Sequence, residues 1–244
     1  MDYLKGYKVF RDDPEWGKKT LTGTLLFLST MFLPVLGQAV LVGWQALILR
    51  RAVRGEDSPL PRLDFDTQYL GKLLALGFKG FIVRFVWSLP VMVIGGGLFV
   101  CAYLGIVVAA VGGAQELGED AAGISMVCCC SASFLILMPI LVLLSLPANV
   151  AAMRTELTDD LNRGLEFGEV MRFTKAMFGP LLKGSLVLWL VGSLLSFVGL
   201  LACYVGAFAV AVAGMAAQAH FVAQVYRAWV EQGGEALPVA ASDV

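Results

Sequence analysis

The chain has 244 residues, of which 58% are hydrophobic and 15% are charged, and its formal net charge is -1. A soluble domain has roughly 45–50% apolar and about 25% charged residues, so a water-soluble core of this length could not cover so much apolar surface. The near-neutral charge argues against nucleic-acid binding, because phosphate binding needs a patch of several cations.

Lysine and arginine are confined to the segments outside four long uncharged stretches, at residues 20–49, 85–115, 121–153 and 184–226. Cations are retained in cytoplasmic loops because moving them across hydrocarbon is costly. The pattern therefore predicts a multi-pass membrane protein whose two termini are both cytoplasmic. The basic residues expected to set this topology are Lys18, Lys19, Arg50, Arg51, Arg54, Arg84, Arg154, Lys183 and Arg227.

The first stretch, residues 20–49, is interrupted by Pro34 and Gly37. Proline removes a helical hydrogen bond and glycine permits a chain reversal. A single tilted crossing, the alternative, would leave the amino-terminal lysines outside and violate the charge rule. We therefore expect a re-entrant hairpin with its turn at these two residues and arms of about 14 residues, which reach roughly 21 Å.

The second and third stretches each suffice for one spanning helix of about 20 residues. We expect these helices at 85–111 and 122–153, joined by a short loop that Glu116, Glu119 and Asp120 mark. An amphipathic helix is expected before them, at 69–83, with Lys72 and Lys79 on one face. The pair of spans therefore forms the second predicted hairpin.

The fourth stretch is too long for one span, so we expect two helices that turn near residues 200–206. An amphipathic helix precedes it, lying on the cytoplasmic leaflet or packed on the bundle. Its apolar face comprises Phe167, Val170, Phe173, Met177 and Leu181, opposite Glu166, Glu169, Arg172 and Lys175. The small and polar residues at 232–244 predict a flexible tail.

Three units therefore recur in the same order, each with an amphipathic segment, an apolar hairpin and a basic exit, at about 8–54, 63–154 and 165–230. We predict an all-α integral membrane fold with one polytopic domain over 1–231. The first of its three parallel hairpins is short or re-entrant, the other two are fully transmembrane, and interfacial amphipathic helices accompany them. Indole rings prefer the headgroup region, so the predicted interface anchors are Trp16, Trp44, Trp87, Trp189 and Trp229.

The sequence resembles domain-of-unknown-function family 4013, a set of prokaryotic polytopic membrane proteins. The residues that carry the resemblance are Phe10, Asp12, Asp13, Trp16, Lys19, Gly37, Gly43, Trp44, Arg50, Arg51, Gly55, Leu60, Pro61, Asp64, Leu89 and Pro90. Tyrosine is more usual at the position of Trp44. The resemblance implies an integral protein of a prokaryotic cytoplasmic membrane and identifies no active site.

Ionisable residues are nearly absent from the predicted spans, although a membrane enzyme or ion-coupled carrier needs them there. We therefore predict no catalytic residue, cofactor or metal site, and we expect Cys128, Cys129 and Cys130 to serve packing. Uncharged polar side chains can join helices or line a pocket. The candidate lining residues are Gln38, Gln45, Asn149, Gln218 and His220.

Three functions fit these observations. The leading hypothesis is a non-catalytic membrane protein that assembles with itself or with partner membrane proteins in the bilayer, because small residues favour close helix packing. The first alternative is a carrier or channel for a neutral or lipid-like solute, which needs a polar cavity between hairpins. The second alternative is a membrane-curvature or scaffold protein, because a short hairpin with interfacial helices expands one leaflet more than the other.

Overall fold

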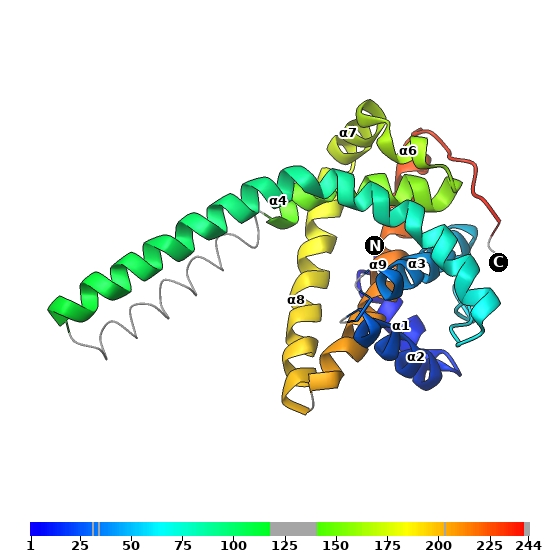
Figure 1. The fold of residues 1–244 in the computed structure, drawn as a ribbon. Coiled ribbons are helices and arrows are strands. Elements are labelled where there is room, and N and C mark those ends of the chain that lie inside the picture. The colour runs from blue at the N-terminus through cyan, green and yellow to red at the C-terminus, as the bar shows by residue number, and fades with distance from the viewer. Residues whose placement is uncertain (31, 34, 118–140, 203, 242–244) are drawn as a thin grey trace.

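The structure is a computed structural model that describes residues 1–30, 32–33, 35–117, 141–202 and 204–241. Every regular element within these residues is a helix, as Figure 1 shows. Among them, three helical segments are long and apolar enough to cross a membrane, namely Thr67–Pro90, Phe178–Leu201 and Val205–Glu231. The predictions for Pro34, the loop at Glu119 and Asp120, and the cysteines at 128–130 concern residues outside this description.

The amino-terminal part contains α1 (Lys5–Asp12), α2 (Trp16–Ser29) and α3 (Leu36–Arg54). Helices α2 and α3 occupy the two arms predicted for the first hairpin; α2 has the expected 14 residues and α3 is longer, with 19. A re-entrant path through the membrane stays a prediction. Helix α3 is the centre of the fold, because it packs on α2, α4 and α9 and is buried at nearly every position from Ala39 to Arg50. It ends at Gly55, whose φ of 86° suits glycine, with the amide of Gly55 donating to the carbonyl of Ala52.

Helix α4 (Thr67–Leu117) continues without a break for 51 residues and contains Pro90. The predicted boundary between an amphipathic helix at 69–83 and a span beginning at 85 is therefore wrong. No helix breaker separates the two segments, and membrane helices tolerate proline. At 1.5 Å per residue α4 is about 76 Å long, more than twice the thickness of a bilayer core. Its second half extends away from the other helices (Figure 1).

The returning chain is helical over residues 141–158 and is followed by α6 (Leu161–Leu165) and α7 (Phe167–Ala176). On the apolar face of α7, Val170 and Phe173 are buried in the protein core. These two residues pack as one of the two expected placements requires, and contact of the helix with a leaflet stays a prediction. Phe167, at the start of the same face, is 65% exposed, so only part of this face contacts protein.

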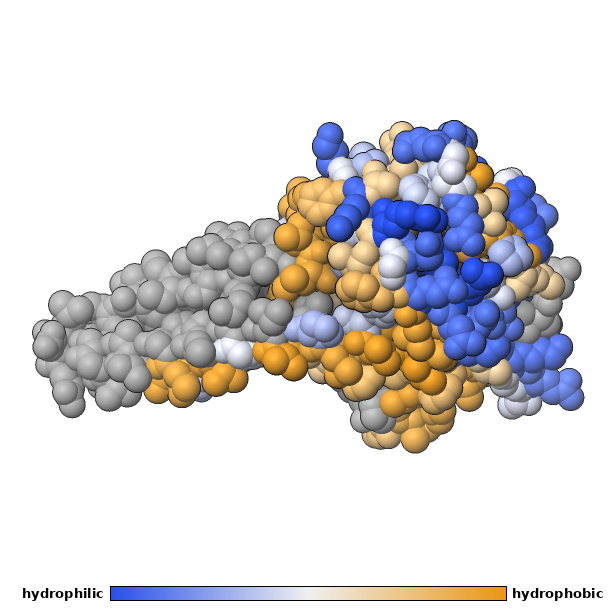
Figure 2. Space-filling view, turned by 90° about the horizontal axis from the view of Figure 1, so that it is seen from above, coloured by the Kyte–Doolittle hydropathy of each residue, from blue (hydrophilic) through white to orange (hydrophobic). Residues whose placement is uncertain are grey.

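Helices α8 (Phe178–Ala202) and α9 (Tyr204–Glu231) follow each other and pack side by side. They approach closely where Gly199 faces the backbone of Gly206. The outer face of α8 is apolar and exposed, with Leu194 at 60%, Phe197 at 63% and Leu201 at 72%. Exposed apolar surface of this kind is typical of a face that contacts lipid or another protein, and α8 is long and apolar enough to cross a membrane. Figure 2 shows hydrophilic residues gathered on one part of the molecule and a hydrophobic band beside them.

The carboxy-terminal segment is packed up to residue 241, in contrast to the flexible tail that its composition predicts. Leu237 is buried, and its backbone amide donates a hydrogen bond to the hydroxyl of Tyr226 at 2.7 Å. The amide of Ala240 donates to the carbonyl of Leu157 at 2.8 Å. Backbone hydrogen bonds to distant helices hold this segment, and its composition gives no sign of them.

Candidate functional site

An open pocket of about 330 Å³ lies between α1, the helix at 141–158, α8 and α9. Its polar lining residues share one property, because all of them are uncharged at neutral pH. They are Tyr7, Ser145, Asn149, Ser185, Trp189, Ser196 and Gln218. Ligand pockets typically have volumes of about 300–1,000 Å³, so this one can hold a small molecule.

The polar lining groups differ in whether they already make a hydrogen bond within the protein. The hydroxyl of Ser145 donates to the carbonyl of Val142 at 2.8 Å. Within the described part of the chain, the side-chain amides of Asn149 and Gln218 make no hydrogen bond. Burial raises the pKa of Tyr7, so its phenol is protonated and can donate. The pocket therefore offers donors and acceptors without formal charge.

The pocket narrows beyond Asn149, Ser185 and Gln218, where a second space is bounded by apolar side chains that include Phe173 and Phe221. This second space has no room for a water molecule. The polar pocket is therefore closed in this direction by packed side chains.

Only two of the five predicted lining residues, Asn149 and Gln218, meet in this pocket. Gln38 is exposed on the first turn of α3, and Gln45 is buried where its side chain accepts a hydrogen bond from Arg84 at 3.1 Å. His220 is also buried, and its Nδ1 lies 3.3 Å from a carboxylate oxygen of Asp57. Helical spacing could not predict this separation, because the five residues come from three different helices and the packing of those helices decides which faces meet.

A buried acid that the sequence analysis missed lies beside Gln45. Glu156 is 3% exposed and accepts a hydrogen bond from Arg84 at 2.6 Å. Burial raises the pKa of Glu156, although the positive charges of Arg84 and Arg50 oppose this shift. Arg84 therefore anchors α4 to the end of the helix at 141–158 as an ion-pair partner, beyond its predicted role in topology.

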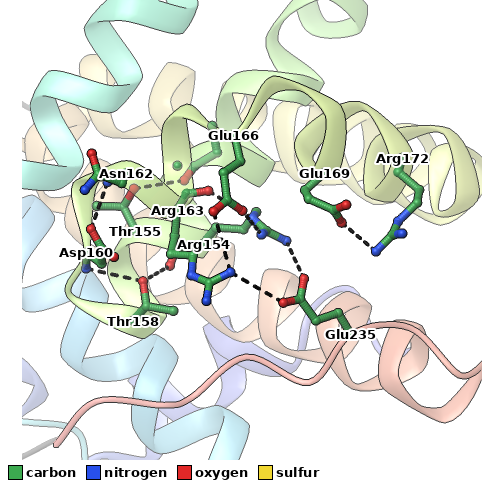
Figure 3. A network of polar contacts seen from close by, with 12 residues as sticks. Arg154, Thr155, Thr158, Asp160, Asn162, Arg163, Glu166, Glu169, Arg172 and Glu235 are labelled. Carbon is green, nitrogen blue, oxygen red and sulfur yellow. Dashed lines mark hydrogen bonds and ion pairs between the residues drawn. The ribbon is translucent and has the colours of Figure 1, made fainter.

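A second polar network surrounds Arg154, which is 2% exposed (Figure 3). Its guanidinium donates to Glu166 at 2.7 Å and to the carbonyl of Arg163 at 3.0 Å. Glu235 from the carboxy-terminal segment lies 3.6 Å from both Arg154 and Arg163. The network joins the helix at 141–158, the start of α7 and the tail, so its role is structural.

A third buried ion pair joins Asp13 and Lys19. The ammonium of Lys19 donates to both carboxylate oxygens of Asp13 at 2.9 Å and to the carbonyl of Leu60 at 3.0 Å. The amide of Leu60 donates back to Asp13 at 2.9 Å. Nearby, the indole of Trp44 donates to the carbonyl of Pro61 at 3.1 Å and lies edge-on to Phe10. Six residues of the family pattern thus meet around one loop.

The tryptophans differ in their surroundings. Trp44 is fully buried, so it cannot contact lipid headgroups, and its ring belongs to the core. Trp87 stacks on Phe167 and donates to the carbonyl of Gly164 at 2.9 Å. Trp229 packs on Phe173, and Trp189 lines the polar pocket. Trp16 is 52% exposed, as an interface anchor requires.

The other basic residues predicted to set the topology differ in exposure and in hydrogen bonding. Lys18 and Lys183 are exposed, and Arg227 is half-buried. Arg51 donates to the carbonyl of Pro59 at 2.9 Å, and Arg54 donates to that of Ala240 at 2.6 Å. The positive residues therefore also hold the loops and tail in place.

Comparison with known proteins found one family. The sequence pattern of the protein family of unknown function DUF4013 matches residues 26–208, about three quarters of the chain. No curated protein and no solved structure matches this chain. The matched range begins after Phe10, Asp13 and Lys19, so the resemblance seen at those residues lies outside it. With its apolar helices and a match over most of its length, the chain belongs to the family DUF4013, whose function is unknown.

Proposed function

We propose that this protein is a non-catalytic membrane protein that binds a small uncharged polar solute in the pocket of Asn149 and Gln218, as a carrier does. The single observation that supports this function is the uncharged polar lining of the pocket between α8, α9 and their neighbours. Both α8 and α9 are candidate membrane spans. Polar groups between such helices are costly to bury unless they bind something, and a polar solute would satisfy them.

The chemistry of the lining favours a neutral ligand. Two side-chain amides, several hydroxyls and one indole N–H can hydrogen-bond a polyol or sugar, but they cannot neutralise an ion. The described lining contains no carboxylate, cation, histidine or cysteine, which supports binding without catalysis.

The closed end of the pocket favours a carrier over an open channel. Phe173 and Phe221 fill the space next to Asn149 and leave no room for water. A solute that passed this barrier would require the helices to move. Alternating exposure of a central site is the usual mode of such carriers.

Self-assembly and membrane bending have less support. Gly199 and Gly206 face each other, and Gly6 packs against the backbone of Ala216 and Ala217, so these small residues make contacts within one chain. Most of the apolar face of α7 is buried in the same chain, which leaves Phe167 as the residue of that face exposed to a leaflet. Both functions therefore have fewer supporting features than the carrier, although Gly96 and Gly97 face open space and leave self-assembly as the second candidate.

The test is solute flux into proteoliposomes that contain the full chain, with glycerol, ribitol and glucose as probes in stopped-flow light scattering. We expect saturable entry of at least one probe. Asn149→Leu and Gln218→Leu should each reduce it about ten-fold, because a lost polar partner costs about 1–3 kcal/mol. The matched control is Gln38→Leu, since Gln38 is exposed and outside the pocket.

Equal flux in the pocket variants and the control would contradict the proposal, as would the absence of saturable entry for all three probes. Circular dichroism and thermal unfolding of each variant establish that a lost flux does not come from a lost fold.

A further inference from the structure

A second pocket lies between α3, the first turns of α4, the end of the helix at 141–158 and the carboxy-terminal segment. Its volume is about 480 Å³, and it is lined by Arg50, Lys72, Ala75, Leu76, Lys79, Asp159, Ala240 and Ala241. The lining contains three cations and one acid, so the pocket is positively charged. It shares no lining residue with the polar pocket.

The guanidinium of Arg50 has one nitrogen at this pocket, Nη2, that makes no hydrogen bond to the described residues. Its side chain is 4% exposed, and it donates from Nε to the carbonyl of Glu156 at 2.6 Å and from Nη1 to that of Ala241 at 2.9 Å. Its Nη2 is buried without a hydrogen bond and lies 3.8 Å from a carboxylate oxygen of Asp159. A buried donor left unpaired is costly, and an anion in the pocket would satisfy it.

The lysines add two further charges from one face of α4. Lys79 is held at the rim, because its ammonium lies 3.1 Å from both the carboxylate and the backbone carbonyl of Asp159. Asp159 has a φ of 58°, a conformation that non-glycine residues rarely adopt, and there it presents its carboxylate to Lys79. Lys72 lies seven residues before Lys79, is exposed, and has no ion-pair partner among the described residues.

An apolar surface continues from this pocket along α4. Ala75 lines the pocket, and Val86 and Leu89 follow on the same helix face with exposures of 42% and 43%. Phe78 and Phe85 are exposed beside them, at 47% and 50%. All of these residues belong to the candidate span Thr67–Pro90.

A basic pocket that opens onto an apolar stripe matches the two parts of a phospholipid. We propose that Arg50, Lys72 and Lys79 bind the phosphate headgroup of an anionic membrane lipid, whose acyl chains lie along α4 from Ala75 toward Leu89. A guanidinium and two ammonium groups recognise a phosphate, and basic pockets between membrane helices bind anionic headgroups. A free phosphate would use the same cations but would gain nothing from the apolar stripe.

The test is native mass spectrometry of the full chain in detergent, titrated with phosphatidylglycerol or phosphatidylcholine. We expect phosphatidylglycerol to bind about ten-fold or more tightly than phosphatidylcholine, and the double variant Lys72→Gln/Lys79→Gln to lose that preference. The control is Lys8→Gln/Lys18→Gln, which removes the same charge from two exposed lysines outside the pocket. Inorganic phosphate and glycerol 3-phosphate serve as soluble competitors.

Equal phosphatidylglycerol affinity in the two double variants would overturn the site. Displacement of the lipid by either soluble phosphate at matched concentration would overturn its assignment to a lipid. The single variant Lys72→Gln controls for misfolding, because Lys72 is exposed and makes no hydrogen bond or ion pair among the described residues. It should lower the affinity for phosphatidylglycerol without changing the melting temperature.

Discussion

At the scale of residues, the buried ion pair between Asp13 and Lys19 shows how charge can be stabilised inside this fold. Their side chains are 0% and 2% exposed, yet every strong polar atom of the pair has a partner. Burial works to raise the pKa of Asp13, but hydrogen bonds from Lys19 and from the amides of Leu60 and Glu15 lower it below its ordinary value of 3.8. The ionised form is therefore favoured by folding.

This shift predicts a pH dependence of stability. Because the folded-state pKa of Asp13 is depressed, its ionised carboxylate stabilises the folded protein fully above about pH 4. This stabilisation is lost as the pH falls through the folded-state pKa. Asp13→Asn should lower the free energy of unfolding by about 3–5 kcal/mol at neutral pH, since it leaves Lys19 buried and unpaired. The melting temperature of this variant should fall less between pH 5 and pH 3 than that of the wild type. Asp12→Asn is the control, because Asp12 is 64% exposed. An equal effect of both variants in differential scanning fluorimetry would show that burial of the pair is unimportant.

At the scale of elements, the packing of α3 on α4 depends on two glycines. A methyl group at Gly43 would overlap the carbonyl oxygen of Leu73, and one at Gly77 would overlap the carbonyl oxygen of Ala39. The two backbones are therefore in direct contact, as small residues permit in membrane helices. This contact brings Gln45 and Arg50 of α3 beside Arg84 and Lys79 of α4, and so it positions both the buried acid and the basic pocket.

Gly43→Ala should therefore destabilise the protein by about 1–3 kcal/mol, the usual cost of overpacking, although alanine is the better helix former. Gly71→Ala is a matched control in α4, because no atom lies within 4 Å of an added methyl group there. Its melting temperature should equal or exceed that of the wild type. A Gly43→Ala protein as stable as Gly71→Ala would mean that α3 and α4 do not pack through this crossing.

At the scale of the whole molecule, the side-by-side arrangement of α8 and α9 brings Phe178 and Glu231 to one end of the pair and Leu201 to the other. The cations Lys183 and Arg227 flank the first end, and the apolar residues Leu200, Leu201 and Val205 surround the second. Because moving cations through hydrocarbon is costly, we predict that the first end lies in the cytoplasm together with the carboxy-terminal segment.

We expect single cysteines to report this orientation after the five native cysteines are replaced by alanine. A membrane-impermeant maleimide should label Asp12→Cys and Gln232→Cys in inverted vesicles only, and Leu201→Cys in intact spheroplasts only. Labelling of Gln232→Cys from outside would refute a cytoplasmic carboxy terminus, and same-side labelling of Leu201→Cys and Gln232→Cys would refute a crossing by α9.

The sequence by itself determined that the chain is helical and suited to a membrane, because hydrophobicity and charge act locally: a long uncharged stretch needs hydrocarbon wherever it folds. It did not determine where each helix begins and ends, since α4 continues through the boundary predicted at residue 84. It also identified the family and the polar residues Asn149 and Gln218. Only the tertiary structure decided which polar groups meet. It buried Trp44, joined Arg84 to Glu156, and placed the tail against Arg50, since such contacts link residues up to 191 positions apart. Helical periodicity gives the face of one helix, whereas a pocket depends on how several helices are packed.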